Sequence, residues 1–203
     1  MQALLIIDLQ NDFCKHGALE VKNGNDVVPI ANLLSEKFDL VVATQDWHPA
    51  DHGSFAANHL WSKPGQIINL DGLEQVLWPV HCVQDSFGAQ FVKELATENI
   101  TRIYQKGTDP LIDSYSGFFD NGHRKSTGLA EYLREKGVKT VYILGLATDY
   151  CVKFTALDAV SEGFATYLIQ DACRGVNLSP ADSENAVQEM KAAGVKIIHS
   201  SSL

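Results

Sequence analysis

The sequence predicts one α/β domain over residues 1–203, an open three-layer fold with a mainly parallel six-stranded sheet and helices on both faces. Two observations predict this fold. Short apolar segments alternate along the chain with segments of helical periodicity, as in proteins whose parallel strands are joined by crossover helices. In addition, the last three units repeat one order, which is a helix, a glycine and a strand.

Six short segments are the predicted strands. The first of them, residues 3–7, is uniformly apolar, as expected for a strand that is covered on both faces of a parallel sheet. A chain of 203 residues is long enough to bury one complete core around such a sheet. The predicted strands are residues 3–7, 40–44, 101–105, 141–144, 165–169 and 195–199.

Five segments have the spacing of helices. In the first, Val27, Ile30, Leu33 and Leu34 recur at intervals that place them on one face. The predicted helices are residues 26–37, 88–99, 126 or 127 to 136, 152–160 and 181–193. By contrast, residues 52–83 show neither periodicity, and a connection of this length in a compact domain is usually functional.

Composition excludes several classes of partner. The chain has 16 basic and 25 acidic residues, and its net charge of −9 repels nucleic acid and anionic membrane surfaces at long range. We expect no signal peptide and no membrane span, because no apolar run approaches the roughly 20 residues that a span needs. The cysteines form no CxxC pair and are too sparse for a disulfide scaffold, which favours a cytoplasmic location.

Reactive side chains follow four of the predicted strands. Asp8 follows the first strand, Asp46 and His48 the second, Lys106 the third, and Cys151 the fourth. Each residue alone could be a solvated loop residue. Because open parallel sheets bind ligands outside the carboxyl ends of their strands, four such ends in succession predict a functional site there.

Cys151 lies where a buried strand turns into a helix. At a helix N-terminus, free backbone N–H groups and the helix dipole favour a thiolate and can also hold an oxyanion. A lone cysteine in this position is more often a small buried hydrophobe. With Asp8 as a base and Lys106 as a compensating charge, however, it would form a nucleophilic triad. A cysteine–histidine pair would need His16 or His123 from a distant loop.

A second group of residues suits a metal ion. Asp46, His48 and His81 offer one oxygen and two imidazole nitrogens, a set that fits Zn²⁺, Fe²⁺ or Mn²⁺ and leaves positions open for water or substrate. A turn aspartate followed by a surface histidine has the same spacing, so the aspartate–histidine motif alone is weak. The sequence leaves open whether His52 and His59 are further ligands, hydrogen-bond partners of ligands or solvated, and Ser54 could reach the metal through water.

Three aromatic residues flank these groups in otherwise polar loops, namely Phe13, Trp78 and Tyr115. The default role of an aromatic side chain is core packing. Three of them close to reactive groups would also suit the walls of a small pocket for a flat ring.

Five motifs, in this order along the chain, resemble those of bacterial nicotinamidases, also called pyrazinamidases, among the isochorismatase-like hydrolases. They are residues 8–13 (DLQNDF), 45–49 (QDWHP), 78–82 (WPVHC), 106–107 (KG) and 145–151 (GLATDYC). Residues 113–116 (DSYS) and 171–176 (DACRGV) agree as well. Each motif alone is weak, but the ordered set is specific and spans essentially the whole chain.

The resemblance implies hydrolysis of nicotinamide, and of pyrazinamide, through a cysteine thioester in the salvage of NAD. By it, Cys151 would attack the carboxamide carbon, Asp8 would move the thiol proton to the departing ammonia, and Lys106 would maintain the charges. Backbone N–H groups of Ala147 and Cys151 would hold the oxyanion, in an arrangement that uses a cis Leu146–Ala147 peptide bond.

The resemblance also implies a divalent metal on Asp46, His48 and His81. Zn²⁺ is the first candidate, with Fe²⁺ or Mn²⁺ as alternatives. The metal would bind the pyridine nitrogen and orient the ring between Phe13, Trp78 and Tyr115. Some relatives take a further ligand from the following loop, and here that position stays open. The expected partner is the small-molecule substrate, and the expected state is a monomer or a homodimer.

Three other functions fit parts of this pattern. Another amide could be the substrate on the same scaffold. An isochorismate-like vinyl ether is a further possibility, although its cleavage does not use the cysteine. A non-catalytic ligand-binding or redox-sensing protein would need a reactive Cys151 but no complete triad.

Overall fold

The computed structural model describes residues 1–203 and confirms the six-stranded sheet. The strand order is β5-β2-β1-β6-β7-β8, and every neighbouring pair is parallel, so the sheet is wholly parallel where the sequence predicted a mainly parallel one. The strands are β1 Gln2–Ile7, β2 Val41–Asp46, β5 Arg102–Lys106, β6 Thr140–Leu146, β7 Ala165–Arg174 and β8 Lys196–Ile198.

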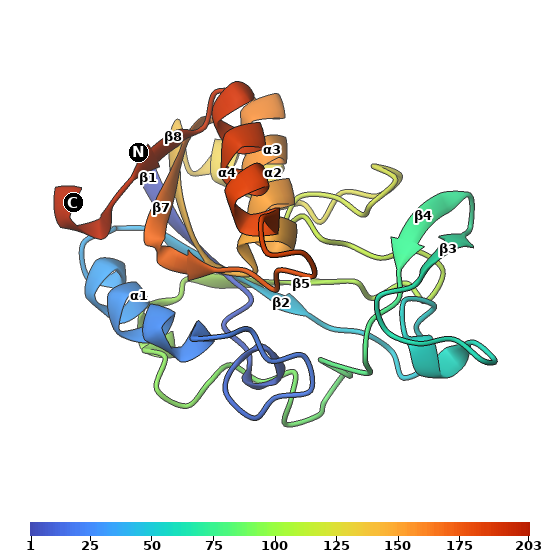
Figure 1. Ribbon diagram of the computed structural model, residues 1–203. Coiled ribbons are helices and arrows are strands. Elements are labelled where there is room, and N and C mark those ends of the chain that lie inside the picture. Colours follow the sequence, from blue (N-terminus) through green and yellow to red (C-terminus); the bar gives the residue numbers. More distant parts are fainter.

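Helices cover both faces of this sheet. They are α1 Val27–Ser35, α2 Leu129–Glu135, α3 Lys153–Ser161 and α4 Asp182–Ala192. Figure 1 shows α1 on one face and the other three on the opposite face. The strand order explains this division: β1, β2 and β5 progress in one direction, whereas β6 returns to the other side of β1, and right-handed crossovers then lie on opposite faces. The order therefore reverses between β1 and β6.

The central strand β1 lies in the middle of the core. All its residues from Ala3 to Ile7 are at most 1% exposed, as predicted from their uniformly apolar sequence. Helix α1 packs on the sheet with Val27, Ala31 and Leu34 fully buried. The predicted inward position of Leu33 was wrong, because that side chain is 57% exposed. Its place is taken by Ala31, which follows Val27 by one turn.

The predicted helix over residues 88–99 was also wrong. This segment consists of turns and one short 3-10 helix, Thr97–Asn99. Its backbone bonds to the loop after β1 instead of to itself: Gln90 O accepts from Asn11 N at 2.9 Å, and Val92 N donates to Leu9 O at 3.0 Å. Val92 and Leu95, two of the apolar residues that gave the segment its helical spacing, are buried all the same, so the apolar pattern is satisfied without a helix.

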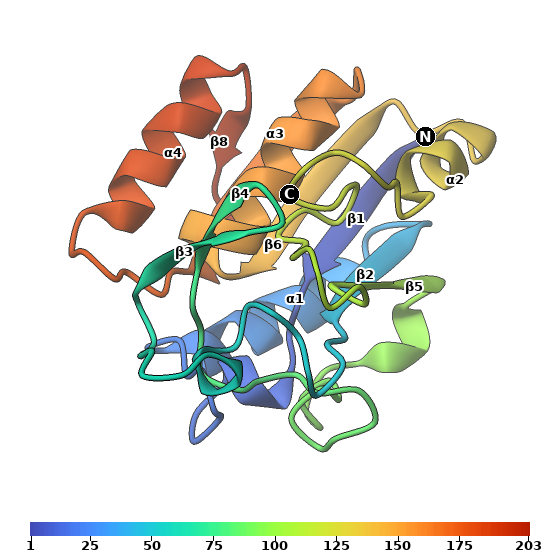
Figure 2. The ribbon, with the colours of Figure 1, turned by 90° about the vertical axis from the view of Figure 1, so that its right-hand side faces the viewer.

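An antiparallel hairpin within residues 52–83 was not predicted. It consists of β3 Ile67–Leu70 and β4 Leu73–Val76. The turn between them has φ values of 48° at Asp71 and 89° at Gly72, which suits an Asp-Gly hairpin turn. The hairpin lies beyond the carboxyl ends of the sheet strands, opposite the two chain termini (Figure 1), and Figure 2 shows it in front of that edge.

None of the helices is long and apolar enough to cross a membrane.

Gly145 brings β6 against β1 at the point where the strand order reverses. It has a φ of 126°, and a methyl group there would lie 2.1 Å from the Ile7 carbonyl oxygen. We expect Gly145→Ala to lower the free energy of unfolding by about 3 kcal/mol, through backbone strain and overpacking together. The measurement is urea unfolding followed by circular dichroism.

Gly163→Ala is the matched control. Its φ is 86°, but a methyl group there meets nothing within 4 Å, so only backbone strain of about 1 kcal/mol applies. Equal losses in the two variants would contradict the close approach of β6 to β1.

Candidate active site

The predicted strand-end residues meet in one buried cluster. Asp46 and Lys106 are the last residues of β2 and β5 and are register partners. Asp8 directly follows β1, and Cys151 lies in the turn after β6. These are the ends of four adjacent strands, and each of the four residues is at most 6% exposed. The sheet topology thus brings together side chains that are far apart in the sequence.

The Lys106 ammonium is the centre of the cluster. Its Nζ lies 3.0 Å from Asp8 Oδ2 and 3.3 Å from Cys151 Sγ, and it donates to Ser114 O at 2.9 Å. It also pairs with Asp46 Oδ1. Burial acts to lower the pKa of Lys106, but the two carboxylates outweigh burial and hold that pKa well above its usual range. The Lys106 side chain is therefore protonated and positively charged at neutral pH.

Asp8 is placed to act as a base. Its Oδ1 accepts a hydrogen bond of 2.6 Å from the Thr44 hydroxyl, and its Oδ2 faces Lys106. Burial raises the pKa of Asp8 above its ordinary value, although the Lys106 charge opposes this. A carboxylate with a raised pKa takes up a proton more readily, as a base for a thiol requires.

Cys151 is not the thiolate at a helix N-terminus that the sequence predicted. Burial, with the charges of Asp8 and Asp46, raises the pKa of the Cys151 thiol well above its usual range, and Lys106 only partly opposes this. The expected helix N-terminus is also different, because Thr148–Val152 form a π-helical turn that already encloses Cys151 before α3 begins. The resting sulfur is consequently a thiol, so it needs a base at the moment of attack.

The turn before Cys151 has the peptide geometry that the resemblance implied. The Leu146–Ala147 bond is cis. The Ala147 carbonyl accepts hydrogen bonds of 3.1 Å from both Tyr150 N and Val152 N, and the Ala147 side of the turn lines a cavity next to Cys151.

The three predicted metal ligands also converge. Asp46 Oδ2 lies 3.7 Å from His48 Nε2 and 3.8 Å from His81 Nε2, with all three residues buried. Each histidine has its Nδ1 bonded at 2.8 Å to a backbone carbonyl, of Gly107 and of Pro79 respectively. A carbonyl accepts only from N–H, so these bonds leave the Nε2 lone pairs free on the side of Asp46. The donor set fits a divalent metal ion.

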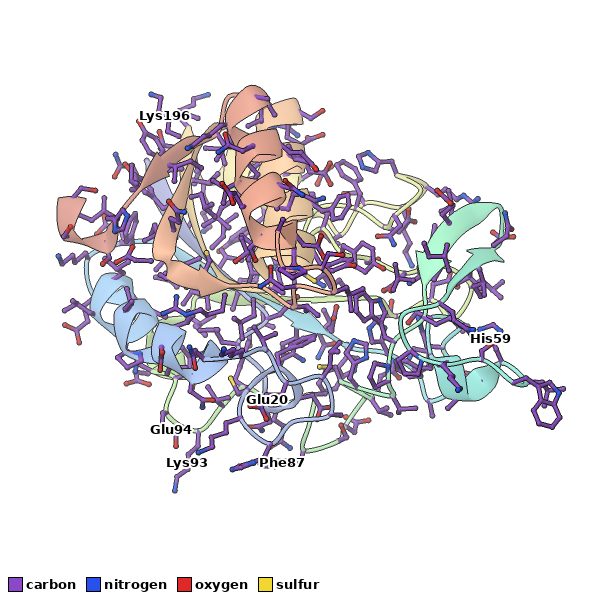
Figure 3. All side chains as sticks on the ribbon, in the orientation of Figure 1. Glu20, His59, Phe87, Lys93, Glu94 and Lys196 are labelled. Carbon is purple, nitrogen blue, oxygen red and sulfur yellow. The ribbon has the colours of Figure 1, made fainter.

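The structure places two of the three residues whose roles the sequence left open, His52 and Ser54, beside the metal-ligand group, and the third, His59, apart from it. His52 lies against His48, with ring centroids 4.3 Å apart, and its Nδ1 is bonded to Ser54 Oγ at 2.7 Å. Its Nε2 is buried and has no hydrogen-bond partner. Burial lowers the pKa of His52 to about 4. His59 instead bonds to Gly53 O at 2.7 Å and lies on the side of the hairpin (Figure 3), apart from this group.

A small, mostly apolar cavity opens onto Cys151. The three predicted aromatic residues, Phe13, Trp78 and Tyr115, all line it, together with Asp46 and His81. Phe87, by contrast, is 76% exposed and points into solvent (Figure 3). The sequence did not single out four further lining residues, which are Leu19, Asp113, Tyr150 and Val176.

Three of these four residues carried a usable signal. Tyr150 directly precedes Cys151, and its ring packs against the rings of Trp78 and Tyr115 with centroids 4.8 Å and 5.3 Å away. Asp113 begins one of the recognised motifs, and Val176 ends the last of them. Leu19, in contrast, comes from a loop without periodicity, and only tertiary structure reveals its position.

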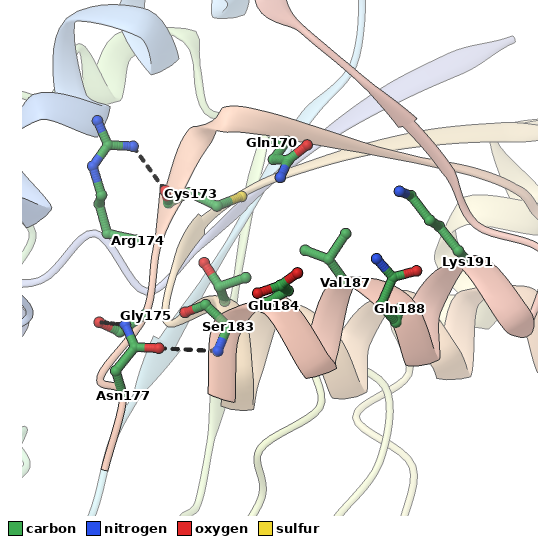
Figure 4. A pocket seen from close by; sticks show the side chains of 11 residues that line it. Gln170, Cys173, Arg174, Gly175, Asn177, Ser183, Glu184, Val187, Gln188 and Lys191 are labelled. Carbon is green, nitrogen blue, oxygen red and sulfur yellow. Dashed lines mark hydrogen bonds between the residues drawn. The ribbon is translucent and has the colours of Figure 1, made fainter. Parts of the chain in front are cut away.

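A second, polar hollow lies between the end of β7 and helix α4 (Figure 4). None of the predicted site residues lines it. Within it Asn177 Oδ1 accepts from Ser183 N at 2.9 Å, which ties the loop after β7 to the start of α4. The cavity at Cys151 is therefore the candidate active site.

The parallel sheet has helices on both faces and a buried cysteine, aspartate and lysine at its carboxyl edge. This arrangement is typical of a hydrolase that has a cysteine nucleophile. A model of the isochorismatase domain matches residues 2–202, and the chain belongs to the isochorismatase family.

Its relatives include nicotinamidases. The nicotinamidase of Escherichia coli (strain K12) is 50% identical over 202 residues, which cover 97% of this chain and 93% of that protein. Among solved structures, an Acinetobacter baumanii nicotinamidase and pyrazinamidase has a TM-score of 0.96 at 46% identity, covering 99% of this chain and 97% of its own. A pyrazinamidase of Pyrococcus horikoshii in complex with zinc has a TM-score of 0.79 at 42% identity, covering 98% of each chain.

The geometry of the metal-ligand set predicts how it responds to mutation. We expect the purified protein to bind Zn²⁺ in a 1:1 ratio, and His48→Ala or Asp46→Asn to weaken binding by at least about 100-fold, because each removes one of three ligands. Equilibrium dialysis with metal analysis measures this. His59→Ala, which removes a histidine outside the group, should leave the affinity unchanged, and an equal loss in that variant would contradict the assignment.

Proposed function

We propose that the protein is a nicotinamidase, which hydrolyses nicotinamide to nicotinate and ammonia and also accepts pyrazinamide. One observation carries the proposal: a single buried ammonium, Lys106 Nζ, contacts both Asp8 and the Cys151 sulfur at the floor of a small apolar cavity. The identity of 50% to a nicotinamidase over 97% of the chain supports the substrate. By this proposal the protein functions in the salvage of NAD.

In the first half of the reaction Cys151 is acylated. Asp8 accepts the thiol proton while the sulfur forms a bond to the carboxamide carbon, and the C=O electron pair moves to oxygen. Backbone N–H groups of Ala147 and Cys151 stabilise that oxyanion. As the oxyanion re-forms the carbonyl, the C–N bond breaks, and the proton held by Asp8 goes to the nitrogen, which leaves as ammonia.

In the second half, water cleaves the thioester. Asp8, again a carboxylate, accepts a proton from a water molecule while the oxygen of that water attacks the acyl carbon. The C–S bond then breaks, the proton held by Asp8 goes to the leaving sulfur, and the acid is released as nicotinate after losing its remaining proton to water. Lys106 contacts both Asp8 and Cys151, so its charge stays close to the negative charge whichever of the two groups carries it.

The aromatic side chains Phe13, Trp78 and Tyr115 bind the flat ring of the substrate. Their surfaces exclude water from the cavity and hold the carboxamide close to the sulfur. Asp46, His48 and His81 would hold a divalent metal ion, which we propose is Zn²⁺, in agreement with the zinc complex of the related pyrazinamidase. At this site a bound ion would supply Lewis acidity toward an aromatic ring nitrogen of the substrate.

We also propose that residues 1–203 form one domain that is a cytoplasmic monomer or homodimer. A single cluster of 47 buried residues, from Ala3 to Val195, supports one domain. All four cysteines are free and buried, which suits a reducing compartment. The net charge of −9 disfavours nucleic acid as a partner.

The nucleophile can be tested by substitution. We expect Cys151→Ala to lower kcat for ammonia release from nicotinamide by at least about 1000-fold, because no thioester can form. Cys151→Ser should be nearly as poor, since a serine hydroxyl is far less acidic than a thiol. Cys173→Ala removes another buried free thiol and should retain turnover. Substantial activity in Cys151→Ala would refute the nucleophile.

The role of Lys106 can be tested through stability as well as activity. Lys106→Met leaves two buried carboxylates without their cation, and we expect it to lower the free energy of unfolding by about 3–5 kcal/mol and to abolish turnover. Adding Asp8→Asn removes one of these charges, so it should recover part of the stability but none of the activity. A Lys106→Met variant as stable and active as the wild type would contradict this account.

A further inference from the structure

The β3–β4 hairpin has one fully buried side chain, and it is polar. The other hairpin positions are exposed or half-buried, whereas Gln75 on β4 is only 3% exposed. Burying an amide is costly unless its hydrogen bonds are made inside the protein. The partners of Gln75 therefore indicate what the hairpin is attached to.

Those partners belong to the wall of the active-site cavity. Gln75 Nε2 lies 3.0 Å from Asp113 Oδ2 and 3.1 Å from the Tyr115 hydroxyl, and it also donates to the Val76 carbonyl at 2.8 Å. The Tyr115 hydroxyl accepts a second hydrogen bond, of 3.2 Å, from Trp78 Nε1. One phenol oxygen thus joins Gln75 to two of the aromatic side chains that line the cavity.

Gln75 itself does not line the cavity and touches none of the reacting groups. Its contacts run through Tyr115 and through Asp113, whose other oxygen, Oδ1, lies 4.0 Å from His48 Nε2. Without Gln75, the Tyr115 hydroxyl would lose one of its two donors and Asp113 Oδ2 its side-chain partner. Both losses would loosen the aromatic wall without changing the nucleophile.

We propose that Gln75 is a positioning residue for substrate binding, which makes the β3–β4 hairpin part of the substrate site. It holds the Tyr115 hydroxyl in place and, through the shared oxygen, the indole of Trp78, so that the two rings keep the spacing that a flat aromatic substrate needs. The choice of nicotinamide as that substrate rests on the function proposed above. Gln75 acts on ring binding and not on the chemistry at Cys151.

Steady-state kinetics separate these two effects. We expect Gln75→Met, which keeps the length of the side chain but removes its donors, to raise KM for nicotinamide about 10-fold, the worth of one buried hydrogen bond, with kcat changed less than about 2-fold. Ile67→Thr, at a position 62% exposed on the partner strand, is the control and should match the wild type. A fall in kcat at unchanged KM would overturn the proposal.

A double-mutant cycle tests the route of the effect. If Gln75 acts through the Tyr115 hydroxyl, Tyr115→Phe removes the same hydrogen bond, and the double variant is little worse than the poorer single variant. If the increases in KM of the two single variants multiply in the double variant, Gln75 acts by another route, and the proposal is overturned. Should Gln75→Met fail to fold, Gln75→Asn, which keeps the amide but shortens its reach to the Tyr115 hydroxyl, takes its place.

A spectroscopic measurement tests the positioning without any turnover. In a ¹⁵N–¹H correlation spectrum, the indole N–H signal of Trp78, assigned with Trp78→Phe, should shift in Gln75→Met, while that of Trp61, which is 96% exposed, stays in place. An unmoved Trp78 signal overturns the role of Gln75. A shifted signal in a protein whose wild type releases no ammonia from nicotinamide overturns the proposed substrate alone.

Discussion

The buried ammonium of Lys106 is the interaction on which the rest of the site depends. Two carboxylates and a thiol share this one cation at the edge of the sheet, where each of these residues is at most 6% exposed. Burying charges is costly unless they are paired, so each member of the cluster requires the others. With Asp8 and Asp46 both ionised, the cluster carries one more negative than positive charge. A divalent cation between Asp46 and the two histidines would reverse that imbalance, which is a physical reason for a metal in this place.

The topology of the sheet supplies the precision that this cluster requires. Because β1 and β6 lie side by side where the strand order reverses, Asp8 and Cys151 come from the two strands that flank the switch point, and Asp46 and Lys106 follow on β2 and β5. Gly145 lets β6 approach the backbone of β1 just before the nucleophile turn. Rigid parallel strands fix the positions of all four groups, whereas the other side chains that line the cavity come from the loops around them.

The sequence was informative wherever one local pattern determines one local structure. Apolar runs located every strand of the sheet, and their ends predicted that Asp8, Asp46, Lys106 and Cys151 would meet. Predictions from the sequence failed where contacts between residues far apart in the chain determine the structure. Residues 88–99 have helical spacing, yet the loop after β1 takes their backbone hydrogen bonds. The high pKa of Cys151 depends on burial and on carboxylates from other strands. The role proposed for Gln75 depends on Tyr115, which lies forty positions later in the chain.

The central claim is that the sulfur of Cys151 carries the acyl group during turnover. Rapid acid quenching of the wild type during nicotinamide hydrolysis, followed by mass spectrometry of its peptides, tests this claim most directly. The account predicts a nicotinoyl group on the peptide that contains Cys151, which appears within the first turnover and disappears once the substrate is consumed. Steady release of ammonia with Cys151 unmodified at every quench time, or with the acyl group on another residue, would contradict it.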